Sequence, residues 1–196
     1  MKTLIVHPED PTTKFLTGIY ATLTNKTVIT GGITKVELWK YIDNHDRVIM
    51  LGHGTPMGLL SVNQFTDCGS YIIDYSMVES LKNKTNNVFI WCNADEFVDR
   101  HSLQGFYSGM FISEVSEAGY FNYWDIDQYC IDESNNGFSA AVSNHINERL
   151  NVLYKNVIDE YSVLAKRNPI ALFNLSRLYL AMSKLNVFPS KVGKTH

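Results

Sequence analysis

The stretch Val48-Ile49-Met50-Leu51-Gly52-His53-Gly54 decides the fold class of this chain. A short apolar run that ends at glycine is typical of a strand buried on both faces of a parallel sheet. The run leads directly into Gly52-His53-Gly54, so His53 is predicted at the carboxyl end of the strand. Open α/β sheets bind ligands and place reactive groups at that end of their strands. The stretch therefore predicts a parallel sheet and the edge of it where chemistry takes place.

Further apolar runs, rich in β-branched and aromatic residues and separated by helical patterns, extend this sheet. The sequence predicts strands at residues 4–6, 27–29, 48–51, 88–91 and 110–112. We expect an α/β three-layer sandwich, with a mostly parallel sheet, helices on both faces and a helical C-terminal segment. The expected organisation is a single domain over residues 1–190, with a strand–helix core at 1–135, a helical part at 136–185 and a tail at 191–196.

The segments between the predicted strands carry helix and turn signals. A helix is predicted from Pro11 through Leu23 with Asp10 or a threonine as its cap, and a second one follows the cap residue Thr34. Residues 57–62 have the pattern of a short hairpin, and residues 71–81 have the pattern of a helix capped by Asp74 or Ser70.

Two helices are predicted in the C-terminal part of the chain. Apolar residues spaced three or four apart between Ile146 and Leu164 form one helical stripe. Asn168-Pro169 then predicts the start of a last helix, with asparagine as the cap and proline in the first turn. Because residues 170–182 are apolar on nearly every side, we expect this helix in the core or in a homodimer contact.

Composition restricts the class of protein. The chain has 196 residues, 45% of them hydrophobic and 19% charged, which excludes a disordered or collagen-like chain. Its net charge of −3 argues against nucleic acid as a partner. We find no signal peptide and no apolar run of roughly the 18 residues that a membrane span needs, so we expect no membrane partner and a cytoplasmic location. The three cysteines, Cys68, Cys92 and Cys130, lack metal-ligand spacing and are expected as free thiols.

His53 and Cys92 are the residues with the clearest chemical potential. Cys92 directly follows the predicted strand at 88–91, so both side chains are expected at the carboxyl ends of strands. A thiol needs a base or a positive neighbour to ionise near neutral pH, and imidazole titrates in that range. The backbone N–H groups of Gly54 and Cys92 are candidates for an oxyanion hole, because glycine lets a carbonyl approach the main chain.

This arrangement resembles the caspase-like superfamily of cysteine peptidases, which includes clostripain, gingipain, separase and metacaspase relatives. The matching motifs are His53-Gly54 after one strand and Cys92 after the next. The resemblance implies a caspase-like sheet, a Cys92–His53 dyad and an oxyanion hole at the Gly54 and Cys92 amides. The chain departs from many relatives by having the bulky Trp91 before the cysteine and Asn93-Ala94 after it.

The resemblance also implies where the residue before the scissile bond binds. In the family this pocket is walled by the loop after the first strand, residues beside the nucleophile and the segment after the fifth strand. In this chain those places carry acids and no lysine or arginine, so we expect cleavage after a basic residue. The predicted substrate-binding residues are Glu9, Asp10, Asp95, Glu96, Glu114 and Glu117.

Other functions remain open at the level of sequence. The main alternative is a catalytically inactive caspase-like module that binds a protein partner or small ligand at the strand ends. A flavodoxin-like phosphate binder ranks last, since no glycine-rich strand-to-helix loop is present. His7, Glu9 and Asp10 contain ligand types for a metal but match no metal motif. For the peptidase we expect a peptide or protein substrate and no cofactor.

Overall fold

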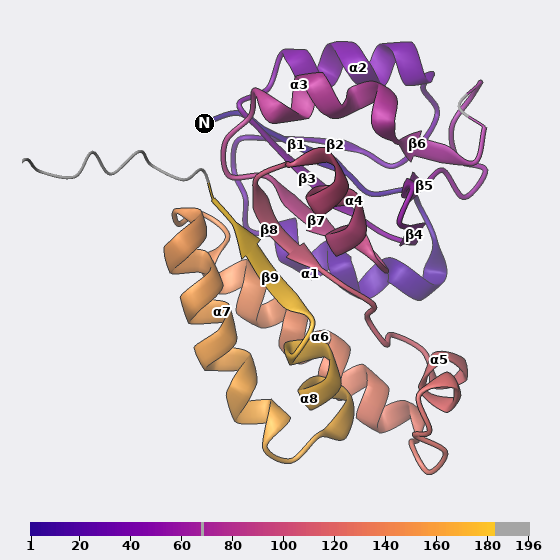
Figure 1. Cartoon of the computed structure of the whole chain (residues 1–196), viewed down its shortest axis with the longest axis vertical. Helices are drawn as coiled ribbons and strands as arrows, with labels where there is room; N and C mark the ends of the chain where they lie inside the picture. Colours follow the sequence, from indigo (N-terminus) through magenta and orange to yellow (C-terminus); the bar gives the residue numbers. More distant parts are fainter. Residues whose placement is uncertain (68, 183–196) are drawn as a thin grey trace, which may run out of the picture.

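A six-stranded sheet forms the centre of the computed structural model, which describes residues 1–67 and 69–182 (Figure 1). The strand order is β2-β1-β3-β7-β8-β9. The first five strands run parallel, and β9 pairs antiparallel with β8. The predicted mostly parallel α/β sheet is therefore confirmed. The strands are β1 (Thr3–Val6), β2 (Lys26–Ile29), β3 (Arg47–Leu51), β7 (Val88–Ile90), β8 (Gly105–Ser108) and β9 (Leu178–Ala181).

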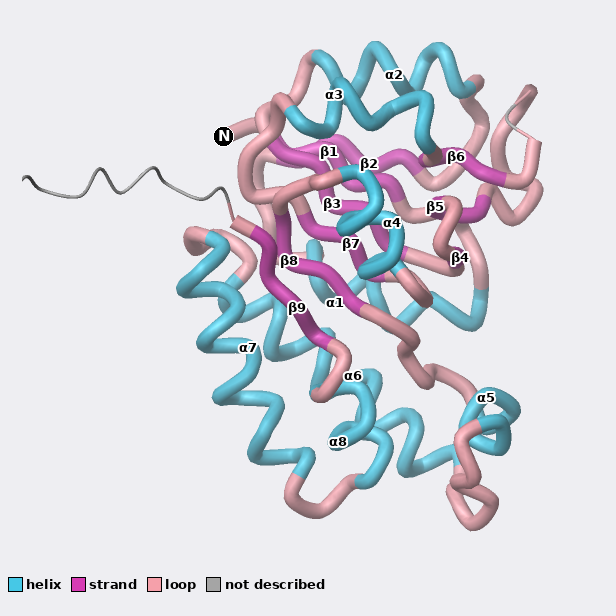
Figure 2. Tube along the Cα trace, viewed as in Figure 1, coloured by secondary structure: helices cyan, strands magenta, loops and turns pink. Residues whose placement is uncertain are grey.

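Helices cover both faces of this sheet (Figure 2). Alternate strand residues point to opposite faces, so Leu4 and Met50 pack with α2, α3 and α4, whereas Ile5 and Ile49 pack with α1, α6 and α7. The three layers follow directly from this alternation. The helices are η1 (Pro11–Leu16), α1 (Thr17–Tyr20), α2 (Lys35–Asp43), η2 (Tyr75–Met77), α3 (Val78–Lys82), α4 (Ala94–His101), α5 (Val115–Tyr120), α6 (Gln128–His145), α7 (Leu150–Ala165) and α8 (Pro169–Leu175).

The predicted helix caps are largely confirmed. The Asp10 carboxylate accepts from the Thr12 amide at the start of η1, and Asn168 accepts from the Ala171 amide at the start of α8. Thr34 and Glu37 form a reciprocal capping box at the start of α2. Such side chains satisfy backbone donors that the first turn of a helix leaves free, which is why the sequence shows these boundaries clearly.

A small antiparallel sheet follows His53. It contains β4 (Gly54–Thr55), β5 (Gly58–Leu60) and β6 (Tyr71–Ile73), with β5 in the middle. The hairpin expected at 57–62 begins earlier, at Gly54, and pairs around Pro56-Met57. The helix predicted over 71–81 is wrong in its first part, because Tyr71–Ile73 is a strand and the Asp74 cap marks the true helical start.

The predicted fifth strand is also misplaced. Gly105–Ser108 forms β8, whereas residues 110–112 lie in a buried connection beyond it. Phe111 packs its ring against Phe138 of α6, with 4.8 Å between the ring centroids. An apolar run buried in a loop has the same pattern as a buried strand, so periodicity alone did not separate them.

The single last helix predicted over 170–182 is replaced by two elements. Helix α8 ends at Leu175, and Leu178–Ala181 pairs as β9 along β8. Residues 170–182 are apolar on nearly every side because they form two elements, α8 and β9, which bury different faces in different layers. The predicted homodimer contact stays a prediction, although the long helix proposed to form it is absent from the described chain. The tail expected at 191–196 lies outside the described residues.

The helical part of the chain begins earlier than predicted, since α6 starts at Gln128. Of the predicted stripe, Leu150, Leu153, Val157 and Tyr161 are buried on α7, while Ile146 caps the end of α6. Both helices pack on the α1 face of the sheet and therefore form the wall nearest to the connection at 110–112.

Candidate functional site

His53 and Cys92 follow two neighbouring parallel strands and occupy equivalent positions in the strand register. Leu51 of β3 pairs with Ile90 of β7, and each candidate residue lies two positions beyond its member of that pair. Both line one small hollow of about 20 Å³, barely more than a single water molecule needs. The structure thus brings together the two residues that the sequence singled out, in a space too small for a substrate side chain. The other residues around the hollow are Thr13, Phe15, Leu16, Gly52, Ile90, Trp91, Phe111 and Ser113.

A sharp turn between β7 and α4 presents Cys92. The Trp91 carbonyl accepts from the Ala94 amide at 3.2 Å, and Asn93 between them has φ 64° and ψ 32°. This left-handed conformation is easiest for glycine, and asparagine is among the residues that tolerate it best. Asn93 therefore takes the backbone conformation for which glycine is otherwise suited, and its presence after the cysteine is compatible with a strand–turn–helix nucleophile position.

Trp91 packs on the sheet face opposite to Cys92. Its ring contacts Phe89 and Phe97, and it belongs to the cluster of α2, α3 and α4. Its indole N–H donates to the Thr55 carbonyl at 3.2 Å. A Cβ at Gly54 would lie only 2.0 Å from the Trp91 ring, so packing alone requires glycine after His53. Trp91 therefore supports both the turn that presents Cys92 and the hairpin that begins at Gly54, from the opposite face of the sheet.

The Gly54 amide is turned away from the hairpin. The Leu60 amide donates to the His53 carbonyl at 2.9 Å, and Gly54 faces Leu59. In an antiparallel ladder this makes Gly54 and Leu59 a non-hydrogen-bonded pair, whose N–H groups point outward. The outward direction suits the predicted role of this amide as an oxyanion donor, which stays a prediction.

Asp10 and Thr12 hold the imidazole of His53. Its Nε2 lies 2.6 Å from the Thr12 hydroxyl and 3.6 Å from an Asp10 carboxylate oxygen. The Thr12 hydroxyl and amide donate to that carboxylate and, together with His53, hold the pKa of Asp10 below its usual range. Since the hydroxyl proton goes to Asp10, the Thr12 oxygen accepts from Nε2–H. Nδ1 is then the nitrogen left to act as a base.

We call the arrangement of the Cys92 thiol in this structure the closed state. Cys92 Sγ donates to the Phe111 carbonyl at 3.4 Å, and within the described residues it makes no hydrogen bond to His53. Burial raises the pKa of the Cys92 thiol to about 11, and the Glu117 carboxylate contributes in the same direction. The thiol is therefore protonated at neutral pH in this conformation.

The six predicted substrate-binding acids lie at different places around the carboxyl edge of the sheet, and their role in binding substrate stays a prediction. Asp10 is committed to Thr12 and His53, and Glu117 accepts from the Ser113 and Glu114 amides. None of the six is among the described residues that line the dyad hollow. Glu9 lies exposed after β1, Asp95 and Glu96 begin α4, and Glu114 lines a separate groove.

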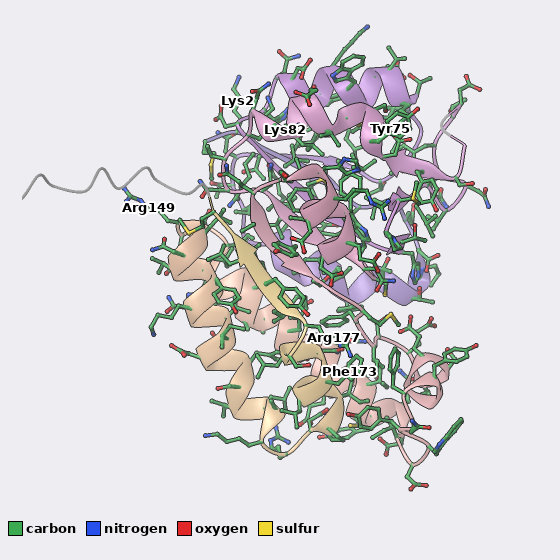
Figure 3. All side chains as sticks on the ribbon, in the orientation of Figure 1. Lys2, Tyr75, Lys82, Arg149, Phe173 and Arg177 are labelled. Carbon is green, nitrogen blue, oxygen red and sulfur yellow. The ribbon has the colours of Figure 1, made fainter. Side chains whose placement is uncertain are left out.

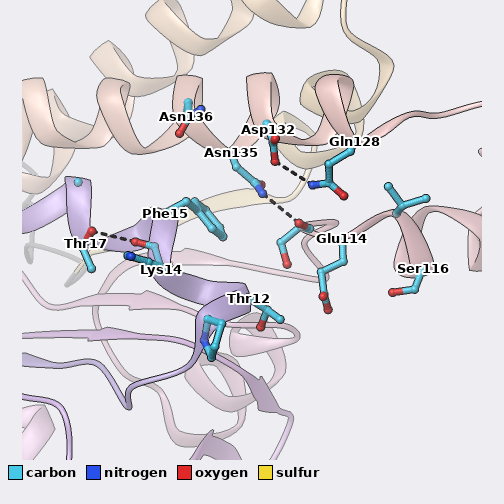
Figure 4. Close-up of a pocket in the computed structure, with 14 residues that line it drawn as sticks. Thr12, Lys14, Phe15, Thr17, Glu114, Ser116, Gln128, Asp132, Asn135 and Asn136 are labelled. Atoms are coloured by element: carbon cyan, nitrogen blue, oxygen red, sulfur yellow. Dashed lines mark hydrogen bonds between the residues drawn. The ribbon is translucent and has the colours of Figure 1, made fainter.

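This larger groove lies between η1–α1, residues 113–116 and α6, and has a volume of about 740 Å³ (Figure 4). Phe15 and Ser113 line both the groove and the dyad hollow, so they form the wall between them. Asn135 of α6 donates to the Ser113 carbonyl at 2.9 Å, but its buried Oδ1 has no hydrogen-bond partner among the described residues. No sequence motif marks this groove, because its residues come from three separate segments.

The metal alternative finds no support in the described residues. There, no group of three or more His, Cys, Asp and Glu side chains is arranged to hold a metal ion. His7 is buried, with its ring nitrogens 3.0 Å from the Tyr20 hydroxyl and 3.2 Å from the Thr13 hydroxyl. Cys92 and Cys130 are free thiols, as predicted, and Cys68 lies outside the described residues.

Comparison with known proteins adds no family. No family model matches the chain, and no significant match to it was found among curated proteins or solved structures. No helix in the described part of the chain is long and apolar enough to cross a membrane.

Proposed function

We propose that this protein is a cysteine endopeptidase that uses Cys92 as nucleophile and His53 as general base. The observation that carries the proposal is that both side chains follow adjacent parallel strands and line one hollow. The resemblance of His53-Gly54 and Cys92 to the caspase-like motifs supports it, as does the strand–turn–helix geometry around Cys92. A nucleophile, a base and a third group that orients the base are the parts such chemistry requires.

The proposed reaction proceeds through an acyl-enzyme. His53 Nδ1 takes the thiol proton while Cys92 Sγ bonds to the peptide carbonyl carbon, and the amides of Gly54 and Cys92 receive the oxyanion. Collapse of this intermediate breaks the C–N bond, and His53 returns the proton to the leaving amine. Water, deprotonated by His53, then hydrolyses the thioester and releases a carboxylic acid and the free thiol. Every proton is carried by His53, and no cofactor takes part.

The protein must open before it reacts. Substrate cannot enter a hollow of about 20 Å³, and the thiol is held by the Phe111 carbonyl. Movement of the connection around Phe111 both releases the Cys92 sulfur from its hydrogen bond and widens the hollow. Exposure of the thiol to water and to His53 then lowers its pKa toward the range in which it reacts.

Matched fluorogenic peptides that end in Arg, Lys or Asp before the reporter group test the proposed activity and its basic specificity. We expect cleavage after Arg or Lys, because Glu114 lies beside the wall of the hollow and no basic residue among those described lines the hollow other than His53. The Cys92→Ala variant serves as the blank. Cleavage after Asp alone contradicts the specificity, and cleavage that persists in Cys92→Ala contradicts the dyad.

Replacing Thr12 by valine is expected to lower kcat/KM about five- to tenfold, the usual value of one hydrogen bond to a charged or polar group. Valine keeps the shape of the side chain but removes the hydroxyl that joins Asp10 to His53. Thr12→Ser is the matched control and should retain most activity. A Thr12→Ser variant as impaired as Thr12→Val shows that the methyl group, and not the hydroxyl, matters at this position.

A second candidate function is the inactive binding module. The observation that favours it is the protonated, half-buried thiol that donates to the Phe111 carbonyl, which is the state of an inert structural cysteine. The two functions differ in one result. A peptide chloromethyl ketone with a terminal arginine should alkylate Cys92 of a peptidase and leave Cys92 of a binding module unmodified.

A further inference from the structure

Three large aromatic side chains stand out into solvent on one segment. Tyr120 is 84% exposed, Trp124 74% and Tyr129 72%. Neighbouring aromatics of the same segment pack inward, with the Phe121 and Tyr123 rings 4.7 Å and 6.1 Å from that of Phe173. The packing of Phe121 and Tyr123 on Phe173 fixes the backbone of this segment. The outward orientation of Tyr120, Trp124 and Tyr129 is therefore part of the fold.

The same segment carries a single sign of charge. Residues 113–133 contain six carboxylates and no lysine or arginine. Glu133 is paired with Arg167, and Glu117 is used on the amides of residues 113 and 114. Within the described chain, the carboxylates of Glu114, Asp125 and Asp132 form no ion pair. Lys14 lines the same groove as Glu114, and Arg167 shares a hollow with Tyr129 and Asp132, so the negative charge of this surface is only partly compensated.

The groove described above continues this surface. Glu114 and Asp132 line it, and so does Asn135, which is only 5% exposed and has an unpartnered Oδ1. A buried amide oxygen without a partner is costly, and a ligand N–H group satisfies it. Lys14 lies at the end of the groove remote from Ser116 and Gln128, so the acidic end is the one next to the exposed aromatics (Figure 4).

We propose that this acid–aromatic surface binds an arginine-rich segment of a polypeptide. We define the surface by Glu114, Tyr120, Trp124, Asp125, Tyr129 and Asp132. A guanidinium stacks on tyrosine and tryptophan faces, pairs with carboxylates and has donors for an amide oxygen, so one chemical group matches all three features. The fold contains one such contact, since the Arg177 guanidinium lies 4.4 Å over the Phe173 ring. The surface lies outside the dyad hollow and acts without the thiol.

Fluorescence anisotropy with the full-length Cys92→Ala chain tests the proposal without cleavage of the probe. The probe is a fluorescein-labelled peptide in which four arginines alternate with glycine. We expect saturable binding that weakens as salt is raised, because exposed charges are screened. The same peptide with citrulline in place of arginine keeps the planar shape, but it lacks the charge and has an acceptor oxygen in place of one donor nitrogen, and it should bind much more weakly.

Variants locate the site. Trp124→Ala, Tyr129→Ala and Asp132→Asn should each weaken binding about threefold to fivefold, as expected for partly exposed cation–π and ion-pair contacts. Tyr75→Ala is the matched control, since Tyr75 is also 72% exposed but lies at the end of the molecule away from Phe173 (Figure 3). Glu79→Gln is the matched acidic control, because Glu79 lies on α3 and is not part of the acid–aromatic surface.

Three outcomes overturn the proposal: no binding of the arginine peptide, equal binding of the citrulline peptide, or equal weakening by the control variants. Circular dichroism of each variant confirms that it folds. Because the thiol is absent from the tested chain, these outcomes leave the peptidase proposal untouched. Failure to cleave fluorogenic peptides, in turn, leaves this proposal untouched.

Discussion

Replacement of His53 by alanine is expected to lower kcat/KM toward an arginyl fluorogenic peptide by about 10²- to 10⁴-fold, the range typical of a general acid–base group. The Cys92 thiol is protonated in the closed state, and His53 is the described base that shares its hollow. Without the imidazole, the proton must leave to water. The remaining rate should rise with pH as hydroxide takes over the role of the base.

The matched control for this experiment is His45→Ala. His45 also contacts a threonine hydroxyl, that of Thr27, but lies at the amino edge of the sheet beside Lys2 and Asn44. That variant should keep wild-type activity. Equal activity of His53→Ala and wild type would contradict the proposed Cys92–His53 dyad. Loss of cooperative urea unfolding in His53→Ala would instead show a structural histidine.

Acidification from pH 6.5 to pH 4 is expected to remove about 3 kcal/mol of stability through His7 alone. Burial lowers the pKa of His7 from 6.5 to about 4 in the folded protein. Between these two values the unfolded chain binds a proton that the folded chain rejects, so the free energy of unfolding falls as pH falls through this window. The contribution is complete about one pH unit above 6.5, and the loss is complete about one pH unit below 4.

Urea unfolding of wild type and His7→Gln at pH 7.5 and at pH 4 isolates this contribution. The variant loses the ring contacts to Tyr20 and Thr13 and should be less stable at pH 7.5. Its stability should fall less on acidification than that of the wild type, by about 3 kcal/mol. Parallel losses in the two proteins would mean that His7 is not the group responsible.

Protonation of His7 also bears on the site. His7 contacts Thr13, and Thr13 stands next to Thr12 in η1, where Thr12 holds His53. Disruption of the buried His7 contacts therefore loosens the support of the proposed base before the whole protein unfolds.

The parallel sheet and the positions of His53 and Cys92 at its carboxyl edge were predictable because the signals are local. Residues 48–51 and 88–91 are continuous apolar runs, and each is followed at once by the residue of interest. Caps such as Thr34 and Asn168 mark helix starts by chemistry contained within four residues. Other local signals misled, since residues 110–112 lie in a connection and Tyr71–Ile73 forms a strand.

Predictions that depended on distant partners were wrong or incomplete. Residues 178–181 have the composition of a buried helix, and only the free edge of β8 makes them a strand. The closed thiol depends on Phe111, nineteen residues beyond Cys92, and no motif marks that carbonyl. The role of Asp10 and Thr12 had a local signal, an aspartate that caps Thr12, but the contact with His53 spans 41 residues.

The antiparallel direction of β9 brings its last residue to the amino edge of the parallel strands. Ala181 lies opposite Gly105 at the amino end of β8, and Thr3 begins β1 at that same edge of the sheet. Thr3 and Ala181 therefore both lie on the side of the sheet remote from His53 and Cys92 (Figure 1). The protein can be tethered to a bead or a sensor surface through its first residues, with the proposed catalytic edge facing the solution.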